Sequence, residues 1–279
     1  TRARKTYSKS FRAFSSVNYP DLAVVQDEHL LQYIRCESRP RPLFYDRLDP
    51  HVGLLKLIPG TEDALAEFML DRYDGLIIES FGVGGIPQRL MDAFAGHELH
   101  FITGHTHLNS NYDIREGVTE HNVAQVCGNL WWDPINWDGT PKGFQLFREC
   151  GGEFSWEYRS LGESPARQIR VWHPGQVAKH PASVVAKVWN WDSYWTVVWY
   201  EDGRYRGAMQ RTTLDDPDYT AHIDSLKAAG RKISKVQRPR PTNFYFTARP
   251  SASARKVEVV ATDRFGHRYS ERIALGHTD

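Results

Sequence analysis

The clearest hydrophobic pattern of the chain lies between residues 52 and 78. Residues 52–58 form a nearly continuous apolar run, which is typical of a strand buried in a parallel sheet. After a Pro-Gly break, Thr61 is placed to cap a helix. Apolar residues then recur on one helical face: Leu65, Phe68 and Met69. An Asp-Gly turn leads into a second apolar run at 76–78, so the pattern predicts a β-α-β unit with parallel strands.

Beyond residue 88 the pattern becomes β-rich. Residues 88–97 predict a short helix, and short runs of strand-forming residues separated by glycine turns follow it. The predicted strands lie at 99–103, 123–127, 144–149, 154–160, 168–172, 184–190, 195–200, 205–212, 243–248 and 256–261. The strands after His173-Pro-Gly175 have the spacing of a small sandwich. The whole pattern predicts an α+β, β-rich fold.

Residues 1–50 show little periodicity and are interrupted by prolines. They predict a connector with short strands at 22–25 and 30–34. The basic residues at the start are typical of a solvated linker, because they lack the interleaved aromatic residues of a nucleic-acid site.

Composition narrows the class of protein. The 35 basic and 34 acidic residues nearly cancel, so no global field draws the chain to nucleic acid. No apolar run reaches the roughly 18 residues of a membrane span. The three cysteines form no close-spaced motif, and the start has no apolar core like that of a signal peptide. Composition therefore leaves the compartment open.

The segment Gly104-His105-Thr106-His107 is the sharpest chemical signal. It follows a predicted strand, and where a strand passes into a loop both imidazoles can turn toward neighbouring metal ions. Two metal ions about 4 Å apart can activate water for an in-line displacement. The alternative is a pair of ordinary loop histidines.

Residues 99–172 resemble the end of a calcineurin-like metallophosphoesterase domain. The segments that carry the resemblance are 100–107, 119–122, 126–128, 131–132, 138–141 and 168–170. Residues 184–275 resemble the accessory C-terminal domain of some bacterial members, at 188–191, 199–203 and 262–266. The resemblance implies two divalent metal ions, with His105 on one and His107 on the other, and a phosphate-ester substrate. The earlier metal-binding motifs of the family are not recognisable upstream of residue 99.

Residues 1–87 resemble the later part of a type I bacterial L-asparaginase. The matching segments are 1–5, 15–20, 52–59 and 73–87. The family's nucleophilic threonines belong to a large N-terminal domain with no counterpart in these segments, so no catalytic residue is carried over. The glycine-rich turn of the family often carries an asparagine, and Gly85 stands in that place here.

The two resemblances give a domain prediction: a connector at 1–50, an asparaginase-like β-α-β unit at 51–88, a β-sheet remnant of a metallophosphoesterase at 89–173, and an accessory sandwich-like β domain at 174–279. The leading functional hypothesis is an incomplete metallophosphoesterase that is inactive alone. One alternative is an L-asparaginase-like amidohydrolase fragment. The accessory domain also suggests a secreted or cell-envelope setting, by resemblance only.

Two further hypotheses remain open. A non-catalytic carbohydrate-binding β domain could use four clustered tryptophans, although their pattern favours core packing: Trp189, Trp191, Trp195 and Trp199. We expect a turn at Asp192-Ser193 that places these tryptophans on the two strands of a hairpin. The chain could also be a chimera of the two families, joined near Gln88-Arg89.

Overall fold

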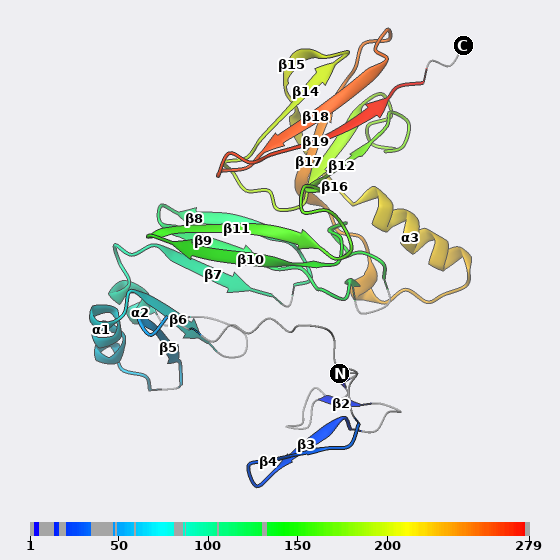
Figure 1. Cartoon of the computed structure of the whole chain (residues 1–279). Helices are drawn as coiled ribbons and strands as arrows, with labels where there is room; N and C mark the ends of the chain where they lie inside the picture. The colour runs from blue at the N-terminus through cyan, green and yellow to red at the C-terminus, as the bar shows by residue number, and fades with distance from the viewer. Residues whose placement is uncertain are drawn as a thin grey trace. The chain divides into compact units, whose positions relative to one another are not determined.

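The computed structural model of the chain contains two compact units, Thr1–Leu90 and Met91–Asp279 (Figure 1). It describes residues 3–5, 14–16, 21–34, 47, 49–58, 60–80, 86, 88–104, 106–129 and 133–276. The glycine-rich turn with Gly85 and the first metal-motif histidine, His105, lie outside these residues. The chain is β-rich with few helices, as its pattern predicts. No helix in the described ranges is long and apolar enough to cross a membrane.

The first unit is organised around a parallel pair of strands. β5 (Val52–Lys56) and β6 (Gly75–Glu79) pair in parallel, and α1 (Asp63–Arg72) connects them. Two antiparallel pairs precede them: β1 (Ala3–Lys5) with β2 (Phe14–Ser16), and β3 (Ala23–Gln26) with β4 (His29–Gln32). The helix α2 (Gln88–Ala93) contains the boundary between the two units.

The start of α1 differs from the expectation. Its N-cap is Glu62, which makes no side-chain capping bond. Thr61 instead donates from Oγ1 to the carbonyl oxygen of Ile58 over 2.8 Å and accepts from the Ile58 amide over 3.0 Å. The threonine hydroxyl thus closes the turn before the helix, because that turn offers it both a donor and an acceptor.

The buried face of α1 is also rotated from the expected one. Ala66 and Met69 are buried, whereas Leu65 and Phe68 are 47% and 60% exposed. The reason is the close approach of the helix to β5, where a Cβ atom at Gly53 would lie 3.0 Å from Met69 Cε. Small residues at 53 and 66 therefore decide which face is buried, and the larger side chains lie outside it.

The second unit begins with a three-stranded sheet covered by a hairpin. Its strands are β7 (Leu99–Thr103), β8 (Ser110–Arg115) and β9 (Val118–Asn122), in the order β7-β9-β8. The hairpin of β10 (Gly143–Cys150) and β11 (Glu153–Ser160) lies over this sheet (Figure 1). Trp156 of the hairpin contacts the ring of His121 of β9, with centroids 4.5 Å apart. The prediction of a strand at 123–127 is wrong. The strand in this part of the chain is the more polar segment just before it, β9.

Two antiparallel four-stranded sheets make up the rest of this unit (Figure 1). The first contains β12 (Ile169–Trp172), β13 (Val184–Val188), β17 (Thr242–Ala248) and β16 (Gln210–Leu214). The second contains β15 (Arg204–Ala208), β14 (Thr196–Glu201), β18 (Lys256–Thr262) and β19 (Arg268–Ala274). Between β16 and β17 the chain forms α3 (Pro217–Ala228) and a short 3-10 turn, η2 (Lys235–Gln237).

The two sheets share one hydrophobic cluster. Val184 and Ala186 of β13 contribute to it from the first sheet, and Val197 and Val259 from the second. All five residues of β13 are buried, and Val185 on its other face joins a separate cluster. The first sheet is therefore covered on both faces, which explains why β13 is almost wholly apolar.

Three of the four clustered tryptophans, at positions 191, 195 and 199, belong to this cluster, and the fourth is buried outside it. Trp189 is 2% exposed, and Trp191, Trp195 and Trp199 are each 8% exposed. β13 and β14 lie in different sheets, so the turn at Asp192-Ser193 connects the sheets and does not form the expected hairpin. This burial favours core packing over sugar stacking, since large rings contribute most to stability when covered.

Candidate functional site

The loop that follows β7 carries the predicted metal-binding motif. Thr106 Oγ1 donates to Asn122 Oδ1 over 2.7 Å, and the carbonyl oxygen of Thr106 accepts from Trp137 Nε1 over 2.9 Å. His107 is half-buried and has a φ of 61°, in the left-handed region. Leu108 then packs against the cluster that the two larger sheets share and against a second cluster, formed by Trp137, Tyr219 and Ile223. The loop backbone around His107 is thus fixed on both sides, which orients its side chain.

His107 contacts a buried amide that the sequence pattern did not indicate. Its Nδ1 lies 3.2 Å from Asn129 Oδ1. Asn129 Nδ2 donates to the hydroxyl of Tyr219 over 2.7 Å and to the carbonyl of Val236 over 3.3 Å. The Tyr219 hydroxyl in turn donates to Asp133 Oδ2 over 3.0 Å. A chain of polar groups therefore leads from the motif to α3, across sequence separations that no local pattern indicates.

The described residues do not fit a closed two-metal site. His107 is the one imidazole of the motif among them, and the contact of its Nδ1 is with a neutral amide, that of Asn129. Across the described ranges, no three histidine, cysteine, aspartate or glutamate side chains are grouped so as to hold a metal ion. A two-metal centre needs carboxylates and imidazoles from several segments. The motif alone supplies too few of them.

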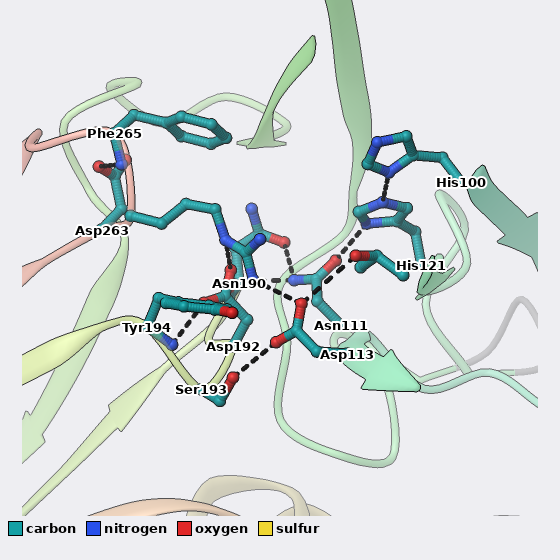
Figure 2. A network of polar contacts seen from close by, with 12 residues as sticks. His100, Asn111, Asp113, His121, Asn190, Asp192, Ser193, Tyr194, Asp263 and Phe265 are labelled. Atoms are coloured by element: carbon teal, nitrogen blue, oxygen red, sulfur yellow. Dashed lines mark hydrogen bonds and ion pairs between the residues drawn. The ribbon is translucent and has the colours of Figure 1, made fainter. Parts of the chain in front are cut away.

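A second polar network lies where β8 meets the β13–β14 connection (Figure 2). Arg264 donates from Nη2 to Asp113 Oδ1 and from Nε to Asp192 Oδ2, each over 2.9 Å. Its guanidinium lies over the rings of Trp156 and Tyr194, 4.7 Å and 4.4 Å from their centroids. Two carboxylates and two aromatic rings together offset the cost of burying the guanidinium charge. We therefore interpret this arrangement as stabilising the fold.

The two carboxylates respond differently to this shared cation. Burial raises the pKa of Asp113, but hydrogen bonds from Ser193 and Arg264 outweigh it and hold the pKa below its ordinary value. Burial also raises the pKa of Asp192, and there the contacts with Arg264 do not overcome it. The difference follows from exposure, since the side chain of Asp192 is 0% exposed and that of Asp113 is 21% exposed.

The same network contains a pair of histidines, of which His121 is buried and His100 is half-buried (Figure 2). Asn111 Nδ2 donates to the carbonyl of Asn190 over 3.0 Å, so its Oδ1 is the acceptor for His121 Nδ1, 2.8 Å away. Nε2 of His121 lies 2.9 Å from Nδ1 of His100, and Nε2 of His100 lies 3.0 Å from Oε1 of Glu98. Burial, with smaller contributions from His100 and Arg264, lowers the pKa of His121 to about 3. His121 is therefore neutral at physiological pH.

A buried lysine lies on the other face of β13. Lys187 donates from Nζ to the carbonyl of Asp138, and Nζ lies 3.6 Å from Asp138 Oδ2. The hydroxyl of Tyr245 donates to Asp216 Oδ2 over 2.8 Å and also lies 3.3 Å from the carbonyl of Asp138. Burial raises the pKa of Asp216, against the attraction of Lys187. These contacts hold the connection around Asp138 on the first sheet.

Comparisons with known proteins identify two sources of similarity. Residues 120–269 match the family described as the C terminal of calcineurin-like phosphoesterase. The L-asparaginase of Thermococcus kodakarensis is 39% identical over 90 residues, covering 32% of this chain and 27% of that protein. A component of the glutamyl-tRNA(Gln) amidotransferase of the same organism is 32% identical over 98 residues, covering 33% and 22%.

A solved structure of the thermostable L-asparaginase from Thermococcus kodakarensis is 35% identical, with a TM-score of 0.20. The matched segment is 33% of this protein and 30% of the asparaginase chain. This chain spans about a quarter of the length of the two curated relatives that it matches.

Proposed function

Because the chain belongs to the family of C-terminal parts of calcineurin-like phosphoesterases, we propose that it is the later portion of a metallophosphoesterase. His105 and His107 are its contribution to a divalent-metal centre for phosphate esters. No further ligand group is found among the described residues, so we expect no hydrolysis of phosphate esters by the chain alone. When bound, the metal ions would supply an activated water and charge neutralisation.

The observation that carries this proposal is the anchoring of His107. The Thr106 contacts fix the loop that follows β7, and Asn129 holds the imidazole from a buried position. A solvated loop histidine needs no such support. A ligand does, because metal-binding imidazoles are commonly oriented by a hydrogen bond at the second ring nitrogen. The orientation therefore supports a ligand role for His107.

Titration with Zn²⁺ and Mn²⁺ by calorimetry, together with hydrolysis of bis(p-nitrophenyl) phosphate, tests the proposal. We expect weak metal binding and no turnover for the unaltered chain. The double change His105→Ala and His107→Ala should abolish that binding, and His97→Ala, at an exposed position, should not alter it. Metal binding that survives the double change would contradict the ligand assignment. Turnover by the unaltered chain would contradict its inactivity alone.

A second candidate function is that of an L-asparaginase-like amidohydrolase fragment. The similarity to the Thermococcus kodakarensis asparaginase over about a third of the chain supports it, as does the parallel β5-α1-β6 arrangement. The chain carries no recognised nucleophile of that family, so we expect no ammonia release from asparagine. Ammonia release by the purified chain would favour this candidate over the first.

Both similarities are accommodated if the chain joins two families near Gln88-Arg89. The division into units between Leu90 and Met91 supports this arrangement. The second unit would then hold a sheet remnant of the phosphoesterase domain and an accessory β-sandwich. A secreted or cell-envelope location is part of the same proposal. Proteolysis that released the second unit as a stable fragment would support the junction, and uniform degradation would argue against it.

A further inference from the structure

The second four-stranded sheet has an outer face that points away from the cluster shared by the two sheets. Its strands lie side by side in the order β15-β14-β18-β19 (Figure 1). Along β14, Val197 and Trp199 enter the cluster, so the alternation of a strand turns Tyr200 to the outer face. Cross-strand pairing then places one residue from each strand in a single row, called the outer row below: Tyr205, Tyr200, Glu258 and Arg272.

The aromatic end of the outer row is open to water. Tyr205 is 61% exposed, and its ring centroid lies 5.5 Å from that of the half-buried Tyr200, with the ring planes at 64°. A tyrosine offers an apolar ring face together with a polar hydroxyl, and such rings are enriched at interfaces for that reason. A sugar ring has the matching character, because its C–H groups gather on one face and its hydroxyl groups lie around the rim.

The other end of the outer row supplies hydrogen-bonding groups. Arg272 Nε lies 3.0 Å from Glu258 Oε1, and the side chains are 64% and 19% exposed. The carboxylate accepts hydrogen bonds and the guanidinium donates them, so the pair can bond hydroxyl groups in both directions. Because the two charges offset each other, this pair adds no net charge to the face.

The remaining charges of the outer face are positive. Lys256 precedes Glu258 by two positions and Arg268 precedes Arg272 by four, so strand alternation places both on this face, and both are exposed. Neither side chain forms an ion pair with a carboxylate of the described residues. The face is therefore basic, although basic and acidic residues nearly cancel over the whole chain. Its charge is complementary to that of an acidic ligand.

We propose that the outer face of this sheet binds an acidic polysaccharide, whose sugar rings carry carboxylate or sulfate groups. The two tyrosines pack against a sugar ring, and the pair of Glu258 and Arg272 bonds its hydroxyl groups. Lys256 and Arg268 pair with its acidic groups. This site is independent of the proposed phosphoesterase origin, and it uses exposed tyrosines where the buried tryptophans of the core are inaccessible.

Retention of the purified chain on immobilised polysaccharides tests the proposal. Alginate supplies carboxylates, heparin supplies sulfates, and dextran is neutral. We expect retention on alginate or heparin and none on dextran. Raising the salt concentration to about 0.5 M should weaken retention, because exposed charges are then screened. Tyr205→Ala should weaken it about tenfold, through the loss of the ring that packs on the sugar.

Matched controls separate this face from the rest of the surface. Tyr194→Ala removes a tyrosine that is 64% exposed but lies in the connection between β13 and β14, and it should not alter retention. The double change Lys256→Gln and Arg268→Gln should reduce retention on the acidic polysaccharides. The double change Arg231→Gln and Lys232→Gln, at exposed positions after α3, removes the same charge and should not.

Melting temperatures of all variants distinguish loss of the site from loss of the fold. A tyrosine pair that serves the sheet alone would lower the melting temperature of Tyr205→Ala and leave retention unchanged, which would overturn the proposal. So would equal retention on dextran, no retention on either acidic polysaccharide, or equal losses in matched and control variants. Tighter binding of single-stranded poly(dT), lost in the same variants, would assign the face to nucleic acid instead.

Discussion

Arg264 donates a 2.9 Å hydrogen bond to Asp113, and so a residue of the β18–β19 turn holds a residue of β8 that is 151 positions earlier. The same guanidinium is bonded to Asp192, whose side chain is fully buried. A single cation therefore ties the three-stranded sheet to the connection between the two larger sheets. The beginning and the end of the second unit are thus joined by side-chain chemistry as well as by apolar packing.

Arg264→Met should strongly destabilise the second unit. It removes the cation and leaves the Asp192 carboxylate buried with the Tyr194 amide as a partner but without a positive charge, and breaking a buried ion pair costs about 3–5 kcal/mol in comparable cases. Urea unfolding at pH 7 measures the loss. Arg272→Met is the control, because its bond with Glu258 is formed by an arginine side chain that is 64% exposed and should contribute about 1 kcal/mol or less. Equal losses for the two variants would contradict the role of Arg264.

Acid should destabilise the chain through His121. Its pKa of about 3 in the folded protein lies below the ordinary value of 6.5, so between these pH values the unfolded chain binds more protons. Stability from this residue is complete above pH 6.5 and falls by up to about 1.4 kcal/mol per pH unit below it. Unfolding free energies at pH 7.0, 6.0 and 5.0 measure the slope. His121→Gln should flatten it, and exposed His97→Gln should not; parallel slopes in all three proteins would disprove the assignment.

Lys187→Met should destabilise more at pH 8 than at pH 5. The lysine is fully buried beside Asp138 and attracts Asp216, whose pKa burial already raises. A carboxyl group with a raised folded-state pKa stabilises the protonated folded form, so its contribution is present at low pH and is lost as pH rises. Without Lys187 the penalty at pH 8 should reach about 3–5 kcal/mol. A pH-independent loss would mean that packing, and not charge, dominates.

Gly139→Ala should destabilise more than Gly151→Ala. Both glycines have positive φ, 81° and 63°, which a side chain adopts at a cost of roughly 1–2 kcal/mol. A Cβ atom at Gly139 would also overlap the carboxylate of Asp216, whereas nothing lies within 4 Å of one at Gly151. The melting temperatures of the two variants separate the cost of backbone strain alone, at Gly151, from the cost of strain together with the overlap with Asp216, at Gly139. A Gly139→Ala variant no less stable than Gly151→Ala would show that Asp216 can move aside.

One element that the hydrophobic pattern did not predict, α3, has a recognisable helix start in the sequence. α3 begins with Asp216 as N-cap and Pro217 in the first turn, a combination that is typical of helix starts. Other errors had no local remedy. The expected strand at 205–212 divides into β15 and β16 in different sheets, because Met209 between them is buried in the cluster that both sheets share. Where a chain crosses between sheets depends on the partners of both strands.

The sequence by itself determined the β-rich class, the strands of strong apolar pattern and the histidine motif, because periodicity and motif spacing act over a few residues. Only the tertiary structure decided that Asn129 holds His107 and that Tyr219, 90 positions from Asn129, holds the amide. It likewise decided that β9 is a strand, since the polar His121 is buried only where Asn111 and His100 satisfy its ring nitrogens. A buried polar group needs a specific partner, and the chain brings that partner from far away.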